Sequence, residues 1–118
     1  MIVEWTFRIK FEKKIMTELQ QEDWNEQRLA SANAVLLDVR TEDEFNEKHL
    51  LGATLMDIRQ PQAFMDAANE LSKDKVYYIY CRSGARSAQA CQLLDQLGVK
   101  ATFNLKGGIL AWTGEVVE

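Results

Sequence analysis

The sequence predicts an α/β domain with a mainly parallel β-sheet, and two observations carry this prediction. First, short apolar runs typical of strands alternate along the chain with segments typical of helices. Second, the run at 34–39 is apolar with almost no alternation, as expected of a strand that is buried on both faces. Because parallel strands need long crossover connections, helices placed between strands favour a parallel sheet.

The first half of the chain contains two predicted strands and two predicted helices. Residues 2–11 alternate between apolar and polar side chains, which predicts a half-buried strand. Residues 20–31 predict a helix with acidic residues near its start, where the helix dipole favours negative charge. The buried strand at 34–39 follows, and a T-x-x-E capping box opens a short helix over 41–48.

The second half repeats the alternation of strands and helices. Runs rich in apolar, aromatic or β-branched residues predict three further strands, at residues 53–58, 75–80 and 101–105. Helical segments are predicted at residues 61–71, 85–97 and, after a glycine turn, 107–112. Pro61 suits the first turn of its helix, and Gly98 is a typical residue for ending the longer one.

Composition and charge exclude several classes of protein. With 118 residues, 47% hydrophobic and 27% charged, the chain suits one globular domain. A net charge of −4 does not favour a nucleic-acid surface, and no apolar run approaches the roughly 20 residues of a membrane span. The first residues lack the pattern of a signal peptide. We therefore expect a cytoplasmic protein with neither nucleic acid nor membrane as a partner.

The cysteine and histidine content argues against a disulfide framework and a metal site. The chain has two cysteines, Cys81 and Cys91, and a single histidine, His49, with no CxxC pair. We therefore expect reduced thiols, no metal and no cofactor. His49 lies beside a turn, where capping or packing is a commoner role than catalysis.

The segment YCRSGARS places Cys81 where the strand at 75–80 ends and just before the helix at 85–97. Ligand sites in α/β sheets form beyond the carboxyl ends of strands. The first amides of a helix have no internal partner, and Gly84 allows the loop to curl so that N–H groups point inward. Because such surroundings lower the pKa of a thiol, this segment predicts a reactive thiolate at Cys81.

Other side chains of this loop also favour anions. Arg82 and Arg86 supply permanent positive charge and forked donors, and Ser83 and Ser87 supply hydroxyl groups. The segment therefore predicts a cradle for an anionic nucleophile, its adduct and an anionic substrate. Cys91 lies in the middle of a helix among apolar residues, which favours a core position over a role as a resolving thiol.

Several motifs, in this order and spacing, resemble the rhodanese family in its single-domain form. They are LLDVRTEDEF (36–45), KHLLGA (48–53), YYIYCRSGARSAQA (77–90), LGV (97–99) and LKGGILAW (105–112). The resemblance covers about residues 15–115 and implies a central, mainly parallel five-stranded sheet with helices on both faces. It divides the chain into a rhodanese-like domain, 15–118, and an N-terminal extension, 1–14.

The resemblance implies a sulfurtransferase in which Cys81 is the catalytic residue. Its thiolate takes a sulfane sulfur from thiosulfate or a persulfide donor, and the resulting persulfide passes that sulfur to cyanide, a thiol or a protein acceptor. The loop amides of Arg82, Ser83, Gly84, Ala85 and Arg86 are expected to hold the transferred sulfur. The two arginines are also expected to steer the anionic end of thiosulfate.

Two other functions remain open from the sequence. One is a non-catalytic rhodanese module that binds a protein partner. The other is a small cysteine phosphatase or arsenate reductase. By the same resemblance, the C-x4-R spacing from Cys81 to Arg86 argues against a phosphatase, because related phosphatases use C-x5-R. The shorter loop suits one sulfur atom better than a phosphoryl group.

Asp38 and Arg40 end the strand at 34–39, at the sheet edge expected to carry Cys81. One interpretation is that they support the loop from behind, as Ser87 does, with Asp38 accepting from loop donors and Arg40 pairing with Glu44. The other, which we favour, is plain structural ion pairing.

The N-terminal extension, 1–14, lies outside the resemblance. It is an added edge strand, an exposed strand that pairs with another chain, or sequence that precedes a natural start at Met16.

Overall fold

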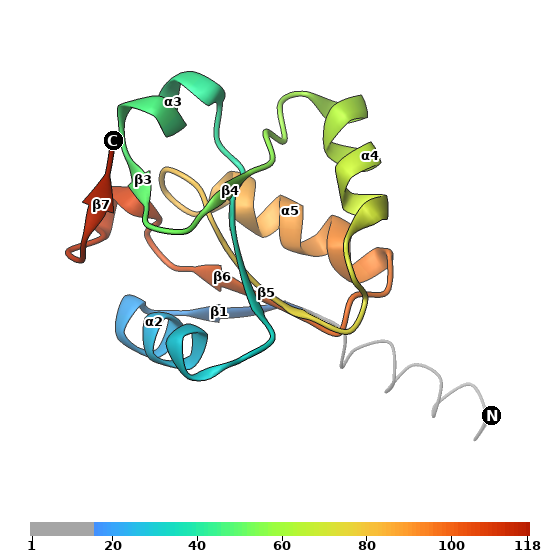
Figure 1. Cartoon of the computed structure of the whole chain (residues 1–118), viewed down its shortest axis with the longest axis horizontal. Helices are drawn as coiled ribbons and strands as arrows, with labels where there is room; N and C mark the ends of the chain where they lie inside the picture. Colours follow the sequence, from blue (N-terminus) through green and yellow to red (C-terminus); the bar gives the residue numbers. More distant parts are fainter. Residues whose placement is uncertain (1–15) are drawn as a thin grey trace.

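The computed structural model describes residues 16–118, so the strand predicted at 2–11 lies outside the described residues. Its main sheet has five strands in the order β1-β6-β5-β2-β4, and every neighbouring pair is parallel (Figure 1). The strands are β1 (Thr17–Leu19), β2 (Ala34–Asp38), β4 (Thr54–Leu55), β5 (Val76–Tyr80) and β6 (Ala101–Leu105). The predicted α/β fold with a parallel five-stranded sheet is confirmed.

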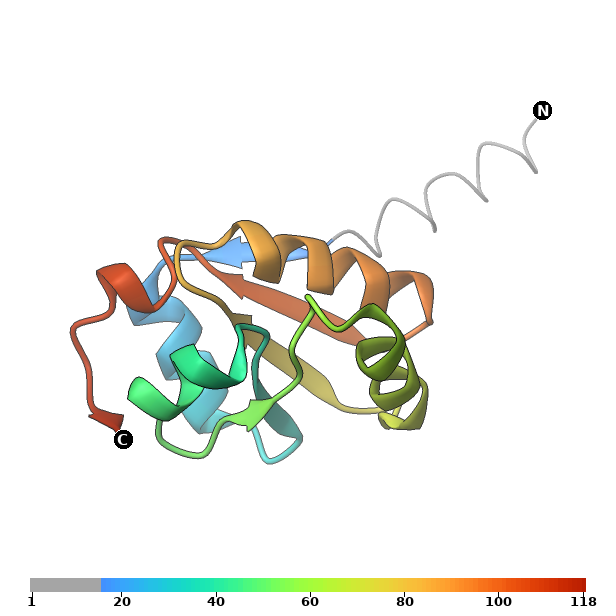
Figure 2. The same ribbon diagram turned by 90° about the horizontal axis from the view of Figure 1, so that it is seen from above.

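Helices cover both faces of this sheet (Figures 1 and 2). They are α2 (Gln21–Ala30), α3 (Glu42–Glu47), α4 (Pro61–Glu70) and α5 (Ala85–Gln96). Successive side chains of β5 point to opposite faces, so each face has its own apolar cluster. Ile79 packs in the cluster with α4 and α5, whereas Tyr78 and Tyr80 pack with Trp24 of α2 on the other face.

The capping box predicted at the start of α3 is present. The Glu44 amide donates to Thr41 Oγ1 at 3.3 Å, and the Thr41 amide donates to Glu44 Oε1 at 3.1 Å. The helix begins directly after Thr41, as the T-x-x-E pattern indicates.

The short elements depart from the sequence-based prediction. The strand predicted at 53–58 is only β4, because the chain leaves the ladder after Leu55, although the Met56 amide still donates to the Asp38 carbonyl at 2.8 Å. β1 was not predicted, and it is too short to show a hydrophobic period. The helix predicted at 107–112 is one 3-10 turn, η1 (Ile109–Ala111).

A second, two-stranded sheet was also absent from the prediction. In it β3 (His49–Leu50) pairs antiparallel with β7 (Val116–Val117). Two-residue strands carry no detectable alternation, and this pair joins distant parts of the chain. Among the described residues, no helix has the length and hydrophobicity of a transmembrane span.

Candidate active site

Cys81 lies directly after β5, at the carboxyl edge of the sheet, and the loop after it leads into α5. Cys81 is 1% exposed. Its Sγ accepts hydrogen bonds from the Gly84 amide at 3.0 Å and from Ser87 Oγ at 3.3 Å. Gly84 has a φ of 110°, in the left-handed region that favours glycine. This conformation turns the loop back so that donors from the start of α5 face the sulfur.

The surroundings of Cys81 favour its thiolate. Burial by itself raises the pKa of this thiol, because the low-dielectric interior disfavours charge. The Ser87 hydroxyl and the amides of Ser87, Gly84 and Ser83 act in the opposite direction, and the net pKa lies below the ordinary value of 9.0. The largest lowering contribution comes from the Ser87 hydroxyl, and the backbone amides of Ser87, Gly84 and Ser83 follow it.

The segment that follows β6 forms backbone hydrogen bonds with the Cys81 loop and so fixes its position. The amides of Ile109 and Leu110 donate to the carbonyls of Cys81 and Arg82 at 2.9 and 3.0 Å. Gly108 allows this approach, because a Cβ at that position would lie 2.6 Å from the Cys81 carbonyl oxygen and would collide with the Arg82 carbonyl. The sequence showed this glycine only as part of a turn.

Asn104 is a further support that the sequence reasoning missed. It is fully buried at the end of β6, and its Nδ2 donates to the Gly84 carbonyl at 3.2 Å and to Glu18 Oε2 at 3.2 Å. The available signal was an asparagine within a segment predicted to be a strand, because a polar side chain that becomes buried there needs a partner.

Arg86 is bound to α3. Its Nη1 and Nη2 donate to Glu44 Oε1 and Oε2 at 2.7 and 2.9 Å, forming a bidentate ion pair. The pair lowers the pKa of the Glu44 carboxyl to about 2 and raises that of Arg86. The charge of Arg86 is therefore matched within the protein. Arg82, in contrast, is exposed and has no hydrogen-bond or ion-pair partner for its side chain among residues 16–118.

The interpretation in which Arg40 pairs with Glu44 is wrong. Arg40 instead binds Asp38, with its Nε and Nη2 donating to the carboxylate at 2.6 to 3.1 Å. Asp38 is fully buried, so its carboxylate needs this partner, and it accepts from Arg40 rather than from the Cys81 loop. Arg40 also donates to the Lys48 carbonyl at 2.7 Å, which ties β2 to the end of α3.

Tyr80 completes this buried polar layer. The Arg40 guanidinium lies over its ring at 5.5 Å, and its hydroxyl accepts from the Leu50 amide at 3.0 Å. Burial raises the pKa of the Tyr80 phenol, which keeps it neutral. The sequence showed Tyr80 only as a strand residue.

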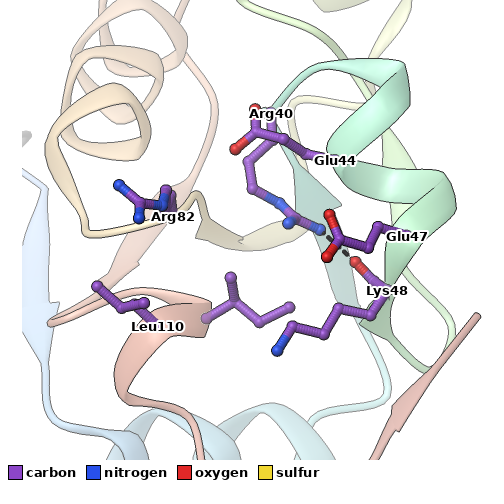
Figure 3. A pocket seen from close by; sticks show the side chains of 7 residues that line it. Arg40, Glu44, Glu47, Lys48, Arg82 and Leu110 are labelled. Atoms are coloured by element: carbon purple, nitrogen blue, oxygen red, sulfur yellow. Dashed lines mark hydrogen bonds between the residues drawn. The ribbon is translucent and has the colours of Figure 1, made fainter.

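A pocket of about 200 Å³ opens beside the Cys81 loop (Figure 3). We call it the rim pocket, and its lining residues are Arg40, Glu44, Glu47, Lys48, Arg82, Ile109 and Leu110. It lies between the loop, the end of α3 and η1, so a molecule within it is next to the residue that follows Cys81.

The remaining candidates lie away from this chemistry. Cys91 is fully buried in the cluster with α4 and α5, and burial raises the pKa of its thiol to about 12. The His49 ring stacks on Phe45 with centroids 3.7 Å apart, and its Nδ1 lies 2.8 Å from the Phe45 carbonyl oxygen, which is a packing role. Within residues 16–118, no three potential metal ligands from His, Cys, Asp and Glu form a group that could hold an ion.

Comparisons with known proteins agree with this architecture. The family model of the rhodanese-like domain matches residues 21–115. A sulfurtransferase from Allochromatium vinosum is 44% identical over 87 residues, which are 73% of this chain and 78% of that protein. A putative sulfurtransferase, YtwF of Bacillus subtilis, is 38% identical over 73% of this chain and 80% of its own length.

Solved structures agree as well. A rhodanese-like domain protein from Staphylococcus aureus superposes with a TM-score of 0.72 at 29% identity, covering 85% of this chain and 94% of that one. The relatives that are named sulfurtransferases support a transferase activity for this chain. By its sequence, its sheet and its matched family model, the chain belongs to the rhodanese-like domain family.

Proposed function

We propose that this protein is a sulfurtransferase that carries a sulfane sulfur as a persulfide on Cys81. The single observation that carries the proposal is the position of Cys81 Sγ. It sits within a ring of donors from Ser83, Gly84 and Ser87 that lowers the pKa of its thiol despite near-complete burial. A thiolate is the nucleophile that sulfur transfer requires.

In the first half-reaction the Cys81 thiolate attacks the outer sulfur of thiosulfate. A bond forms between Sγ and that sulfur, the sulfur–sulfur bond of thiosulfate breaks, and sulfite leaves with the electron pair. In the second half-reaction a thiolate or cyanide attacks the outer sulfur of the persulfide, and the electron pair returns to Sγ. Two half-reactions on one nucleophile predict ping-pong kinetics.

The loop residues then have distinct roles. The amides from Arg82 through Ser83, Gly84 and Ala85 to Arg86 hold the transferred sulfur, and the Arg82 guanidinium attracts the sulfonate of the donor. Arg86 acts mainly through its ion pair with Glu44, which fixes the start of α5 against α3. This modifies the expectation from the sequence, in which both arginines steer thiosulfate.

Three residues support the loop without touching the substrate in this mechanism. Ser87 donates to Sγ through its hydroxyl. Asp38 and Arg40 form a buried ion pair, and Arg40, which lines the rim pocket, also donates to the Lys48 carbonyl. Their proposed contribution is a rigid edge of the sheet on which the loop rests.

The experiment that tests the proposal is intact mass spectrometry before and after thiosulfate treatment. The expected result is a gain of one sulfur atom that requires Cys81 and disappears when cyanide is added. Cys81→Ser should show no gain, whereas Cys91→Ser, the matched control, should gain the sulfur. A wild-type protein that never gains sulfur would favour the non-catalytic binding module instead.

A further inference from the structure

Some charged side chains of the rim pocket have no partner within the described part of the protein. Two of its charged groups are satisfied internally, because Arg40 binds Asp38 and Glu44 binds Arg86. The side chains of Glu47, Lys48 and Arg82 have neither a hydrogen bond nor an ion pair within the described residues, and all three are exposed. The pocket therefore offers two positive charges and one negative charge to a ligand.

The arrangement of these charges is asymmetric. Arg82 comes from the loop, next to Cys81, whereas Glu47 and Lys48 come from the end of α3 on the opposite side (Figure 3). Ile109 and Leu110 add apolar surface to the lining, and Leu110 is 67% exposed. A complementary molecule is thus small, with a carboxylate, an ammonium group and a short apolar part.

We propose that the rim pocket selects the sulfur acceptor, and that this acceptor is a small zwitterionic thiol of the amino-acid or short-peptide type. The inference rests on the proposed function, since the acceptor must meet a persulfide on Cys81. The acceptor carboxylate binds Arg82 and Lys48, and its ammonium group binds Glu47. A volume of about 200 Å³ suits an amino-acid-sized thiol.

The transfer step is balanced without an added oxidant or reductant. The acceptor thiolate attacks the outer sulfur of the Cys81 persulfide, and a new sulfur–sulfur bond forms on the acceptor. The bond between that sulfur and Sγ breaks, and its electron pair remains on Sγ as the thiolate. A proton on the outer sulfur moves to the acceptor together with that sulfur. The products are therefore an acceptor persulfide and the resting enzyme with its Cys81 thiolate.

The test uses full-length protein loaded with thiosulfate, freed of excess donor and checked by intact mass. Its discharge is then timed in a single turnover with four thiols: cysteine, mercaptoacetate, 2-mercaptoethanol and cysteamine. Rates are expressed per thiolate and divided by the rate at which the same thiol discharges a small-molecule persulfide, which corrects for both the ionised fraction and the intrinsic nucleophilicity of each thiolate. The expected order is the order in which the thiols are named, with cysteine about tenfold faster than neutral 2-mercaptoethanol, as expected for a few exposed ion pairs acting together.

Single variants separate the two charges. Glu47→Gln should slow cysteine about two- to fivefold and leave mercaptoacetate unslowed, the magnitude of one exposed ion pair. Lys48→Gln should slow both carboxylate-bearing thiols and spare 2-mercaptoethanol. The matched controls are Glu70→Gln and Lys75→Gln, exposed residues at the end of α4 and just before β5, away from the rim pocket.

The possible outcomes distinguish this inference from the proposed function. Normal loading followed by equal normalised rates for all four thiols would overturn the acceptor assignment and leave the sulfurtransferase intact. The same conclusion follows if Glu47→Gln and Lys48→Gln slow all four thiols alike. A protein that never gains the sulfur fails before any acceptor is added, and both proposals then fall.

Discussion

The two cysteines of this protein are equally buried and chemically opposite. Cys81 is 1% exposed and Cys91 is 0% exposed, and both belong to the same apolar cluster beneath α4 and α5. The pKa of Cys81 lies below its ordinary value, whereas burial raises that of Cys91 to about 12. Burial disfavours the thiolate at both positions. At Cys81 the hydrogen-bond donors that the loop directs at the sulfur outweigh this effect, whereas at Cys91 burial prevails.

The largest expected effect is the loss of one cysteine compared with the other. Cys81→Ser should lower sulfur transfer from thiosulfate to cyanide by at least roughly a thousandfold, as expected when a nucleophile is removed. Cys91→Ser should retain most of the activity, because its thiol is a core group. Steady-state assays of both variants check this, and a comparable loss in both would remove the distinction between the two sites.

Moving the loop should have the next largest effect. Gly108→Ala places a Cβ against the carbonyls of Cys81 and Arg82, so the loop must shift, and a loss of about tenfold or more in kcat/KM is expected from strain of about 1–3 kcal/mol. Gly52→Ala is the matched control. Gly52 has a similar positive φ of 87°, but a Cβ there has no neighbour within 4 Å. Equal losses of activity would show that backbone strain alone, and not the loop position, is responsible.

Removing one hydrogen-bond donor from Cys81 should reduce the difference in pKa between the two thiols. Ser87→Ala deletes the hydroxyl that donates to Cys81 Sγ, so the pKa of Cys81 should rise, and persulfide formation at neutral pH should slow about tenfold, the worth of one hydrogen bond to a charged group. Ultraviolet thiolate absorbance, titrated against pH in the Cys91→Ser background, measures this shift. Because the deficit is one of protonation, the loading rate should recover towards wild type at high pH.

Ser83→Ala is the control for that titration. Ser83 acts on Cys81 through its backbone amide, which alanine retains, so the pKa of Cys81 should stay near the wild-type value. A shift as large as that of Ser87→Ala would mean that the hydroxyl groups act through the loop conformation rather than through a hydrogen bond to sulfur.

The smallest expected effect concerns the ion pair that anchors the loop to α3. Folding lowers the pKa of Glu44 from 4.5 to about 2, so the pair stabilises the fold above pH 4.5 and loses that contribution as the pH falls to about 2. Glu44→Gln should therefore unfold at lower denaturant concentration than wild type at neutral pH, and the difference should shrink across that acid window. Glu70→Gln, an exposed glutamate without an ion pair in the described residues, should show no comparable window. A gap for Glu44→Gln that is independent of pH would contradict the ion-pair explanation.

Local patterns in the sequence were sufficient for the longer elements. Apolar runs predicted β2, β5 and β6, and a capping box predicted α3, because these signals depend on neighbouring residues alone. The short strands β3 and β7 were missed, since two residues carry no period and their pairing depends on contact between distant parts of the chain. β4 ended sooner than its apolar run indicated.

By itself, the sequence determined that Cys81 lies between a strand end and a helix start, with Gly84 to turn the loop. These features are encoded within a few residues, so the donors around the sulfur follow from local geometry. Only the tertiary structure decided that Arg86 pairs with Glu44, 42 residues away, and that Asp38 takes Arg40 instead. An ion pair forms between side chains that are close in space, and the order of residues along the chain does not show which charged side chains the fold brings together. Because Arg40 and Glu44 are paired within the protein, the charges of the rim pocket that remain without a partner in the described residues are those of Glu47, Lys48 and Arg82.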